Sequence, residues 1–282
     1  MPPPLRIPVL MYHSIAARMT STFREYTVTT ARLREHLAAL HAGGWQTLTF
    51  SEAVARLRDP ARAGHGRPAV ALTFDDGFAD FLDALEILRE HRASATLYVP
   101  TAHVGRRAGW LTGSDADRPL LTWAALTDIQ DTGVEIGSHG HQHAALDLGP
   151  PDRIEQDLLT SRLMLEDRLG VPVTTLAYPY GHHTGKTRRA ALRAGYGNAC
   201  TVTGLAATSG DPVLAMPRLA VTQDLDGAAL TAQLAARTPP WQRPWAIGKQ
   251  HLWNAARKIG RIGPQGLDRS PRRIPANQDA QA

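Results

Sequence analysis

Two adjacent carboxylates, Asp75 and Asp76, directly follow a run that begins with the apolar stretch Ala69–Leu72, and Gly77 comes next. A run that is apolar at every position is typical of a strand buried on both faces, so the acids are expected at its C-terminal end. Neighbouring carboxylates are costly to bury unless a cation or a proton relieves them. The pair therefore suggests a metal site in which one Asp binds the cation and the other handles protons. The alternative is a helix N-cap formed by Asp76 or Asp80.

Three histidines, His139, His141 and His143, occur within five residues after another predicted strand. Imidazole is a ligand for zinc, iron, nickel and cobalt, and one carboxylate would complete a three-ligand site open to water and substrate. His139 and His143 can share a face, whereas His141 is expected to point elsewhere. A single histidine is more often hydrogen bonded than metal bound, but three so close together favour a metal. The iron triad of oxygenases uses the same ligands, and the second Asp disfavours it.

Strands and helices alternate along the chain, which favours a parallel sheet with helical crossovers. Polar clusters around His13, Asp75, His139 and Tyr180 each follow directly on a predicted strand. In a (β/α) barrel these strand ends converge on one face, where active sites lie, and an open doubly wound sheet would gather them less well. The sequence therefore predicts an α/β protein of the distorted (β/α)7-barrel type.

The pattern predicts helices and further strands around these clusters, and the segment 100–121 is predicted to be a substrate loop. Ser51 is expected to cap the second helix. The predicted helices are 30–41, 51–59, 81–91, 122–133, 151–169, 186–194 and 227–237, and the predicted strands besides the one before Asp75 are 7–11, 45–50, 93–99, 134–137, 173–177, 198–202 and 214–221.

Composition excludes several classes of protein. The single cysteine, Cys200, excludes an intramolecular disulfide framework. Residues 239–282 carry eight Lys and Arg against two Asp and Glu, whereas residues 1–238 carry 23 against 24. Because the body of the chain is nearly neutral, it has no electrostatic footprint for nucleic acid. The sequence shows no long apolar stretch of the kind that a signal peptide or a membrane span requires.

The order of the motifs T-F-D-D-G, S-H-x-x-x-H and Y-P-Y-G, after P-V-L-M-Y-H near the N-terminus, resembles the polysaccharide deacetylase family (NodB-like, carbohydrate esterase family 4). The resemblance spans roughly residues 7–222 and is nearest the branch of the bacterial poly-N-acetylglucosamine deacetylases. It implies a distorted (β/α)7-type barrel, a divalent metal and hydrolysis of an N-acetyl group on an amino-sugar glycan. Zinc is the expected ion, with iron, nickel and cobalt as alternatives.

The resemblance also assigns roles to individual residues. It implies that Asp75 is the general base and that the metal is bound by Asp76, His139 and His143. The backbone N–H of Tyr180 would stabilise the oxyanion. His13, in the M-Y-H turn, would protonate the leaving amine, with His141 or His182 as the alternative donor.

Two positions depart from the family pattern. The residue after His139, usually Ser or Thr, is Gly140, and the arginine that often holds the base is replaced by Ala177. Arg218 ends another predicted strand and could supply the missing charge to Asp75, although a solvated arginine is nearly as good an interpretation. A degenerate, sugar-binding protein without activity and a deformylase of a lipid-linked amino sugar are the alternative functions.

The basic tail suggests a location. We expect residues 1–238 to form the barrel and residues 239–282 to form a partly disordered tail. Within it, residues 245–262 can form a helix with one apolar and one basic face, which is typical of peripheral contact with anionic lipid. A helix that packs on the barrel is the equal alternative. The membrane interpretation predicts a cytoplasmic protein held at the inner face of the membrane, where a lipid-linked glycan becomes the substrate.

Overall fold

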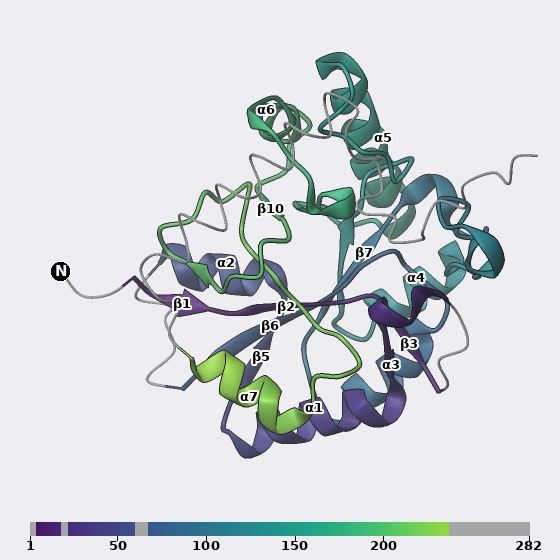
Figure 1. Ribbon diagram of the computed structural model, residues 1–282. Helices are drawn as coiled ribbons and strands as arrows, with labels where there is room; N and C mark the ends of the chain where they lie inside the picture. The colour runs from purple at the N-terminus through teal and green to yellow at the C-terminus, as the bar shows by residue number, and fades with distance from the viewer. Residues whose placement is uncertain (1–3, 18–21, 60–66, 237–282) are drawn as a thin grey trace, which may run out of the picture.

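The computed structural model of the protein describes residues 4–17, 22–59 and 67–236. Strands and helices alternate along these ranges, and the helices surround a curled sheet (Figure 1). The strands are β1 Arg6–Ile7, β2 Val9–Tyr12, β3 Ser14–Ala16, β4 Thr27–Thr29, β5 Gln46–Leu48, β6 Ala69–Phe74, β7 Thr96–Val99, β8 Glu135–Ser138, β9 Thr175–Ala177, β10 Asn198–Cys200, β11 Ala207–Thr208 and β12 Leu219–Ala220.

The α-helices lie close to their predicted positions. They are α1 Thr30–Ala42, α2 Phe50–Arg58, α3 Phe81–Glu90, α4 Trp123–Gln130, α5 Pro151–Leu169, α6 Gly185–Arg193 and α7 Gly227–Ala235. Short 3-10 turns lie between them, namely η1 Thr22–Tyr26, η3 Thr101–His103, η4 Gly113–Asp117 and η5 Pro179–Gly181.

The main sheet is parallel throughout and runs in the order β10, β9, β8, β7, β6, β2 and β12, with β5 also paired to β6. Ala71 pairs with Val9 of β2 on one edge of β6 and with Leu48 of β5 on the other. Farther along that second edge, β7 takes the place of β5, because Thr73 pairs with Thr96. Parallel neighbours require crossover connections, and the helices between the strands supply them. The predicted (β/α)7-type barrel is thus confirmed.

One irregular segment, residues 213–220, brings the two ends of this sheet together. It first hydrogen bonds to β10, where the N–H of Met216 donates to Ala199 and the N–H of Thr201 donates to Met216. It then becomes β12, which pairs with β2 through Leu219 and Leu10. The sequence predicts one long strand over 214–221, whereas most of this segment is irregular because it passes from one partner strand to another.

Local signals explain most of the element boundaries. Pro151 opens α5, and Gly170 ends it in the left-handed conformation with a φ of 69°. The prediction that Ser51 caps α2 is wrong, because Thr49 is the N-cap and forms a capping box with Glu52. The short pairs β1 with β11 and β3 with β4 were not predicted, since two or three residues are too few to show a period.

The strand before the two aspartates is buried as its composition predicts. Val70, Leu72 and Phe74 of β6 lie in the largest hydrophobic cluster together with Leu33 of α1 and Leu85 of α3. Burying these side chains between sheet and helices stabilises the barrel by roughly 1.5–3 kcal/mol for each large apolar side chain. The strand that carries the acids is therefore held rigidly at the centre of the sheet.

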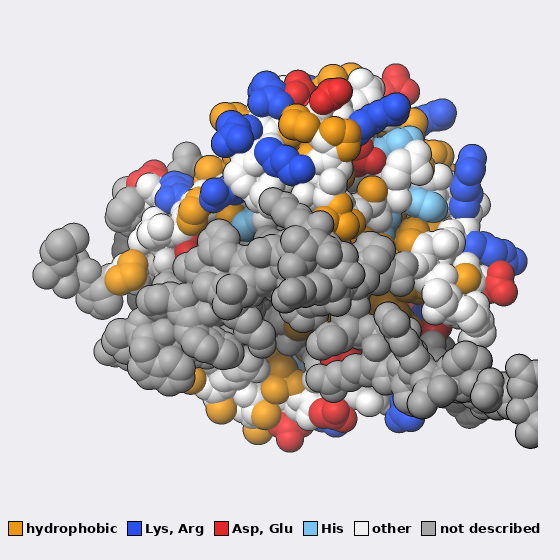
Figure 2. Space-filling view, turned by 45° about the horizontal axis from the view of Figure 1, so that its top comes forward, with side chains coloured by type: hydrophobic (Ala, Val, Ile, Leu, Met, Phe, Trp, Pro, Cys, Tyr) orange, Lys and Arg blue, Asp and Glu red, His pale blue; other side chains and the backbone are white. Residues whose placement is uncertain are grey.

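The surface of the barrel is uneven in charge. Lys and Arg side chains gather on the upper part of the molecule in Figure 2, where Figure 1 places α5 and α6, and α6 alone carries Lys186, Arg188, Arg189 and Arg193. Among the helices of the described ranges, none has both the length and the apolar character that crossing a bilayer requires. The predicted tail, residues 239–282, lies outside the described residues.

Candidate metal centre and active site

The polar clusters predicted at four strand ends lie at the C-terminal ends of neighbouring parallel strands. His13 follows β2, Asp75 and Asp76 follow β6, His139 follows β8, and Tyr180 lies in η5 just after β9. Since β2, β6, β7, β8 and β9 are consecutive in the sheet, these side chains reach the same face of the barrel. Helical crossovers return the chain outside the barrel, so residues more than a hundred positions apart become neighbours.

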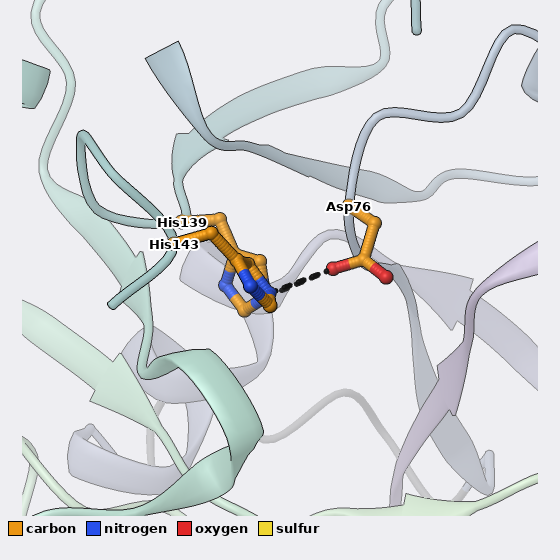
Figure 3. A group of neighbouring side chains, drawn as sticks. All are labelled: Asp76, His139 and His143. Carbon is orange, nitrogen blue, oxygen red and sulfur yellow. Dashed lines mark ion pairs between the residues drawn. The ribbon is translucent and has the colours of Figure 1, made fainter. Parts of the chain in front are cut away.

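Asp76, His139 and His143 form a compact buried group (Figure 3). Their ligand atoms all lie within 4.8 Å of one another. Oδ1 of Asp76 is 3.3 Å from Nε2 of His139 and 3.1 Å from Nε2 of His143. Two ligand atoms of a tetrahedral zinc site lie roughly 3.4 Å apart, given bonds of about 2.0–2.2 Å. The group therefore has the donor types and the spacing that a small divalent cation requires.

The hydrogen bond on the far side of His139 supports this interpretation. Its Nδ1 lies 2.8 Å from the carbonyl oxygen of Ala177, so this nitrogen carries the proton and donates it. In the neutral ring, Nε2 then presents a lone pair toward Asp76, and a lone pair facing a carboxylate oxygen needs a cation or a proton between them. The residues present thus fit a metal ion.

Burial and neighbouring ionisable side chains shift the pKa values of the three residues in this group. Burial alone would raise the pKa of Asp76, but the two imidazoles hold it well below its ordinary value. Burial lowers the pKa of His143, which favours the neutral ring that a metal ligand needs. For His139 the effect of burial is outweighed by the carboxylates of Asp75 and Asp76, and the pKa is raised. A cation and a proton would therefore compete for His139.

Backbone strain is concentrated at this site. Among the described non-glycine residues, only four have a positive φ, and three of them are Asp76 at 76°, His143 at 52° and Tyr180 at 60°. The left-handed conformation is unfavourable for residues with a side chain and persists only where the surrounding structure imposes it. The fourth residue, Arg92, lies away from the site. Interactions elsewhere in the folded protein must therefore offset the conformational cost at these three residues.

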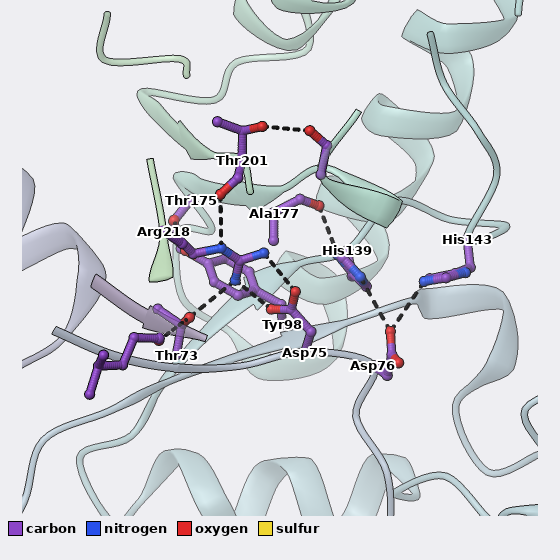
Figure 4. A network of polar contacts seen from close by, with 12 residues as sticks. Thr73, Asp75, Asp76, Tyr98, His139, His143, Thr175, Ala177, Thr201 and Arg218 are labelled. Atoms are coloured by element: carbon purple, nitrogen blue, oxygen red, sulfur yellow. Dashed lines mark hydrogen bonds and ion pairs between the residues drawn. The ribbon is translucent and has the colours of Figure 1, made fainter. Parts of the chain in front are cut away.

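Asp75 has a different partner from its neighbour (Figure 4). Arg218 donates from Nη1 to Oδ1 of Asp75 at 2.7 Å and from Nη2 to Oδ2 at 2.6 Å. The guanidinium is completely buried, also reaches Thr73 Oγ1, and lies 5.7 Å from the centre of the Tyr98 ring. Burial alone would raise the pKa of Asp75, yet Arg218, followed by His139, holds it below the ordinary value.

Ala177 stands where the family often has an arginine that holds the base, and this ion pair shows that Arg218 holds Asp75 instead. The sequence leaves open whether Arg218 pairs with Asp75 or is solvated, and the structure shows the bidentate pair. Asp75 is thereby kept ionised and fixed in orientation, which is what a general base at this position would require. That catalytic role remains a prediction.

His13 is half-buried on the same side of the barrel. Its ring packs edge-on against Tyr26 at 5.1 Å and Phe23 at 6.2 Å between ring centres. Burial lowers the pKa of His13, and the negative charges of Asp76 and Asp75 partly offset that effect. The charges of both carboxylates therefore act on the pKa of His13, although its ring does not belong to the group of three metal-type ligands.

Tyr180 and His141 complete the predicted set. The ring of Tyr180 lies edge-on to His143 at 4.8 Å, so η5 forms one wall of the site. His141 does not join the ligand group, and its Nδ1 lies 2.8 Å from Thr101 Oγ1 instead. His182 lies behind Tyr180, with 6.4 Å between their ring centres. The orientation expected for His141 agrees with this arrangement.

Trp110 is a site residue that sequence reasoning missed. Its ring stacks on the imidazole of His143 at 4.3 Å with an angle of 27°. The segment around it is ordered as a hairpin in which the N–H of Ala108 donates to Arg118, while Leu121 donates to Gly77 beside the two aspartates. The predicted loop 100–121 therefore covers the metal-type ligands. A single Trp in a polar loop gave no signal of that contact.

A polar network behind His13 was also missed. Oδ2 of Asp80 accepts from Ser14 Oγ at 2.5 Å, and Arg118 donates to the same hydroxyl at 2.9 Å. Arg118 also pairs with Asp115, which accepts from the backbone N–H of Phe23. The network thereby connects the hairpin to β3 through Ser14 and to η1 through Phe23.

The protein thus combines a (β/α)7-type barrel with an Asp-His-His group and a separate, arginine-held aspartate. Residues 62–199 match the family model described as polysaccharide deacetylase. This match covers just under half of the chain, and over that part the chain is similar to the polysaccharide deacetylases.

Individual relatives agree with this family. YxkH of Bacillus subtilis, a protein assigned to the polysaccharide deacetylases, is 27% identical over 232 residues, which cover 82% of this chain and 77% of YxkH. A chitooligosaccharide deacetylase of Sinorhizobium fredii is 29% identical over 130 residues, 44% of this chain and 53% of that protein. Among solved structures, the deacetylase PplD of Streptococcus pyogenes superposes with a TM-score of 0.71 at 23% identity, covering 83% of this chain and all of PplD.

Proposed function

We propose that this protein is a metal-dependent hydrolase that removes an N-acetyl group from an amino-sugar glycan. The observation that carries the proposal is the contrast between two adjacent carboxylates. Asp76 faces the imidazoles of His139 and His143, whereas Asp75 is held by the buried guanidinium of Arg218. The contrast supports a division of labour in which Asp76 helps to hold a cation and Asp75 moves protons.

The chemistry follows from the residues around this pair. A divalent cation bound by Asp76, His139 and His143 would polarise the acetamide carbonyl and acidify a neighbouring water. Asp75, ionised by its contact with Arg218, takes a proton from water as the water oxygen adds to the carbonyl carbon. The backbone N–H of Tyr180 is assigned to the oxygen that becomes negative.

The second half of the reaction breaks the C–N bond. The amine is a poor leaving group unless its nitrogen gains a proton, and His13 is assigned as the donor. The products are acetate and a free amine on the sugar. His13 suits the task because its ring is half-buried beside both carboxylates, so that it can act close to the reacting group.

The substrate class is inferred from relatives and from the family resemblance. The Sinorhizobium relative is named for chitooligosaccharides, which are N-acetylated amino-sugar oligomers. We propose a related glycan, of the poly-N-acetylglucosamine kind or lipid-linked, as the substrate here. A deformylase acting on a lipid-linked amino sugar would use the same residues, and comparing acetylated with formylated sugars distinguishes the two.

The test of the proposal is acetate release from N-acetylglucosamine oligomers, measured together with metal content by elemental analysis. We expect one divalent ion per chain, with zinc favoured, and we expect Asp75→Asn to lower turnover by about 10²–10⁴ while keeping the metal. Asp76→Asn should lose both metal and turnover. Because Asp75→Asn leaves the Arg218 charge without its partner, metal content is measured per folded protein.

Each result separates one interpretation from another. Equal loss of metal in the two Asn variants would show that the roles of the aspartates are assigned wrongly. Full metal stoichiometry after replacing both His139 and His143 by Ala would overturn the metal site. Oligosaccharide binding without acetate or formate release would instead favour a degenerate sugar-binding protein.

The assignment of His13 has its own prediction. His13→Ala should lower kcat by about 10²–10⁴ with the metal content unchanged. Since a protonated imidazole is required and burial lowers the pKa of His13, kcat/KM should fall as the pH rises through that lowered pKa. This alkaline limb should disappear in the variant. Wild-type turnover by His13→Ala would transfer the role to His141 or His182.

A further inference from the structure

The loop that carries both metal-type histidines is held from outside the site by one carboxylate. The backbone N–H of His141 donates to Oδ1 of Asp157 at 2.8 Å, and the N–H of Gln142 donates to Oδ2 at 3.0 Å. Asp157 lies in the second turn of α5, 14 residues beyond His143. Both of its oxygens are thus used on the two residues directly before His143.

Ser161, one helical turn farther along α5, holds the other end of the same loop. Its hydroxyl donates to the carbonyl oxygen of Gly140 at 3.0 Å and lies 2.8 Å from the hydroxyl of Ser138. Ser138 in turn accepts from the N–H of Gly140 at 3.1 Å. Each hydroxyl then donates one bond and accepts one, and Ser161 is completely buried. The peptide groups on both sides of Gly140 are therefore fixed.

Gly140 makes the approach of Asp157 possible. Its φ is 72°, and a Cβ atom built at this position would lie 2.9 Å from Oδ1 of Asp157. A side chain here would have to adopt an unfavourable backbone conformation and would push the carboxylate away from the two N–H groups. Gly140 and Asp157 therefore depend on each other. The hydroxyl expected after His139 is absent, and α5 holds the loop together with η3, where the N–H groups of Thr101 and Ala102 donate to the carbonyl oxygens of Gly140 and His141.

We propose that Asp157 and Ser161 are positioning residues that set the separation of the His139 and His143 imidazoles for the cation. The inference rests on the metal site of the proposed function. His139 directly precedes the held peptides and His143 directly follows them, and His143 has the strained φ of 52°. Without these hydrogen bonds His143 can relax, and the three ligand atoms lose the spacing that favours a metal ion.

The experiment measures the affinity of the full-length chain for Zn²⁺, without substrate, by competition with a chromophoric chelator. Asp157→Ala should weaken binding by about 10- to 100-fold, the usual effect of removing a group that orients a metal ligand. Asp157→Asn keeps one acceptor oxygen and should lie between Asp157→Ala and the wild type. Asp167→Ala is the matched control, since Asp167 is an exposed acid on the same helix for which no contact with the loop is found in the described structure.

A second measurement separates positioning from general destabilisation. The visible spectrum of bound Co²⁺ reports ligand geometry, and we expect it to change in Asp157→Ala but not in Asp167→Ala. The Tm of the metal-free protein is measured alongside. Wild-type Zn²⁺ affinity and an unaltered Co²⁺ spectrum in Asp157→Ala would overturn the proposal, as would an equal loss of affinity in the Asp167→Ala control.

A double-mutant cycle keeps the test informative if Asp157→Ala folds poorly. Gly140→Ala should weaken Zn²⁺ binding in the wild type, and it should cost less when Asp157 is already Asn, because one of the two hydrogen bonds is then already weakened. Equal costs in both backgrounds would refute the coupling. Acetate release is assayed separately, so a protein that binds Zn²⁺ as expected but releases no acetate would contradict the proposed function and leave this inference standing.

Discussion

At the scale of single residues, adjacent carboxylates acquire different properties from their partners. Asp75 receives two hydrogen bonds from a fixed positive charge, while Asp76 faces two rings that can be neutral. The left-handed φ of 76° at Asp76 separates the directions in which the two side chains leave the backbone. An electrostatic conflict in the sequence is thereby eased, because Arg218 supplies positive charge to Asp75 and the proposed cation would supply it to Asp76.

The contact between Arg218 and Asp75 predicts a specific pH effect. Arg218 lowers the pKa of Asp75, so its removal in Arg218→Met should raise that pKa. Since the base must be ionised, the acidic limb of kcat/KM should move to higher pH. Arg218→Lys keeps the charge and should move the limb less.

Stability must be followed in the same variants. Breaking a buried ion pair costs about 3–5 kcal/mol, so the Tm of Arg218→Met should fall as well. The profile of kcat/KM is therefore recorded at a temperature where both variants remain folded. An acidic limb at the wild-type pH in folded Arg218→Met would show that Asp75 is not the titrating base.

At the scale of elements, the short turns after the strands connect the site to the helices. Asp80 occupies the N-cap position of α3, but its side chain makes no capping hydrogen bond. It reaches back to Ser14 in β3, next to His13. The helix-cap interpretation of Asp80 is therefore wrong, and a carboxylate near one strand end holds the turn at another.

Asp80 predicts a pH dependence of stability. Burial raises its pKa to about 6 from an ordinary value of 3.8. The folded state thus favours the protonated acid, and the stability contributed by this group is complete below pH 3.8 and is lost as the pH rises through about 6. The shift corresponds to roughly 2–3 kcal/mol.

Asp80→Asn removes this titration without a large change in shape. The Tm of the wild type minus the Tm of Asp80→Asn should fall by several degrees between pH 4 and pH 6 and should be constant above pH 7. Glu86→Gln, at an exposed position of the same helix, is the control. A difference that does not vary with pH would show that the pKa of Asp80 is ordinary.

At the scale of the whole molecule, we propose different tasks for the barrel and the tail. The segment 213–220 links β10 to β2 and carries Arg218 into the centre. Residues 239–282 lie outside the described residues, and we propose that residues 245–262 form a helix that binds anionic lipid. Such an anchor would hold a cytoplasmic enzyme at the inner face of the membrane and would favour a lipid-linked substrate.

The tail proposal is tested by sedimentation with liposomes that contain anionic lipid. The full chain should bind, and binding should fall strongly with added salt because lipid attraction is electrostatic. Replacing Arg257, Lys258 and Arg261 by Glu in the full chain should reduce binding to the level seen with neutral liposomes. Equal binding by the two proteins would remove the anchor and the reason for a lipid-linked substrate.

Much of this protein is determined by its sequence alone. The apolar run before Asp75, the end of α5 at Gly170 and the clusters at strand ends are local signals, because period, capping and turn chemistry depend on neighbouring residues. They predict the barrel and bring Asp76, His139 and His143 to one face. The spacing of these residues in the chain suffices to suggest a metal site.

Only the tertiary structure decides which distant residues support that site. Arg218 lies 143 positions from Asp75, and the choice between an ion pair and a solvated arginine depends on how 213–220 crosses between two strands. Trp110 over His143 and Asp157 beneath Gly140 depend likewise on the packing of a hairpin and of α5. These contacts leave no period or motif in the sequence, since they join surfaces that meet only when the barrel has closed.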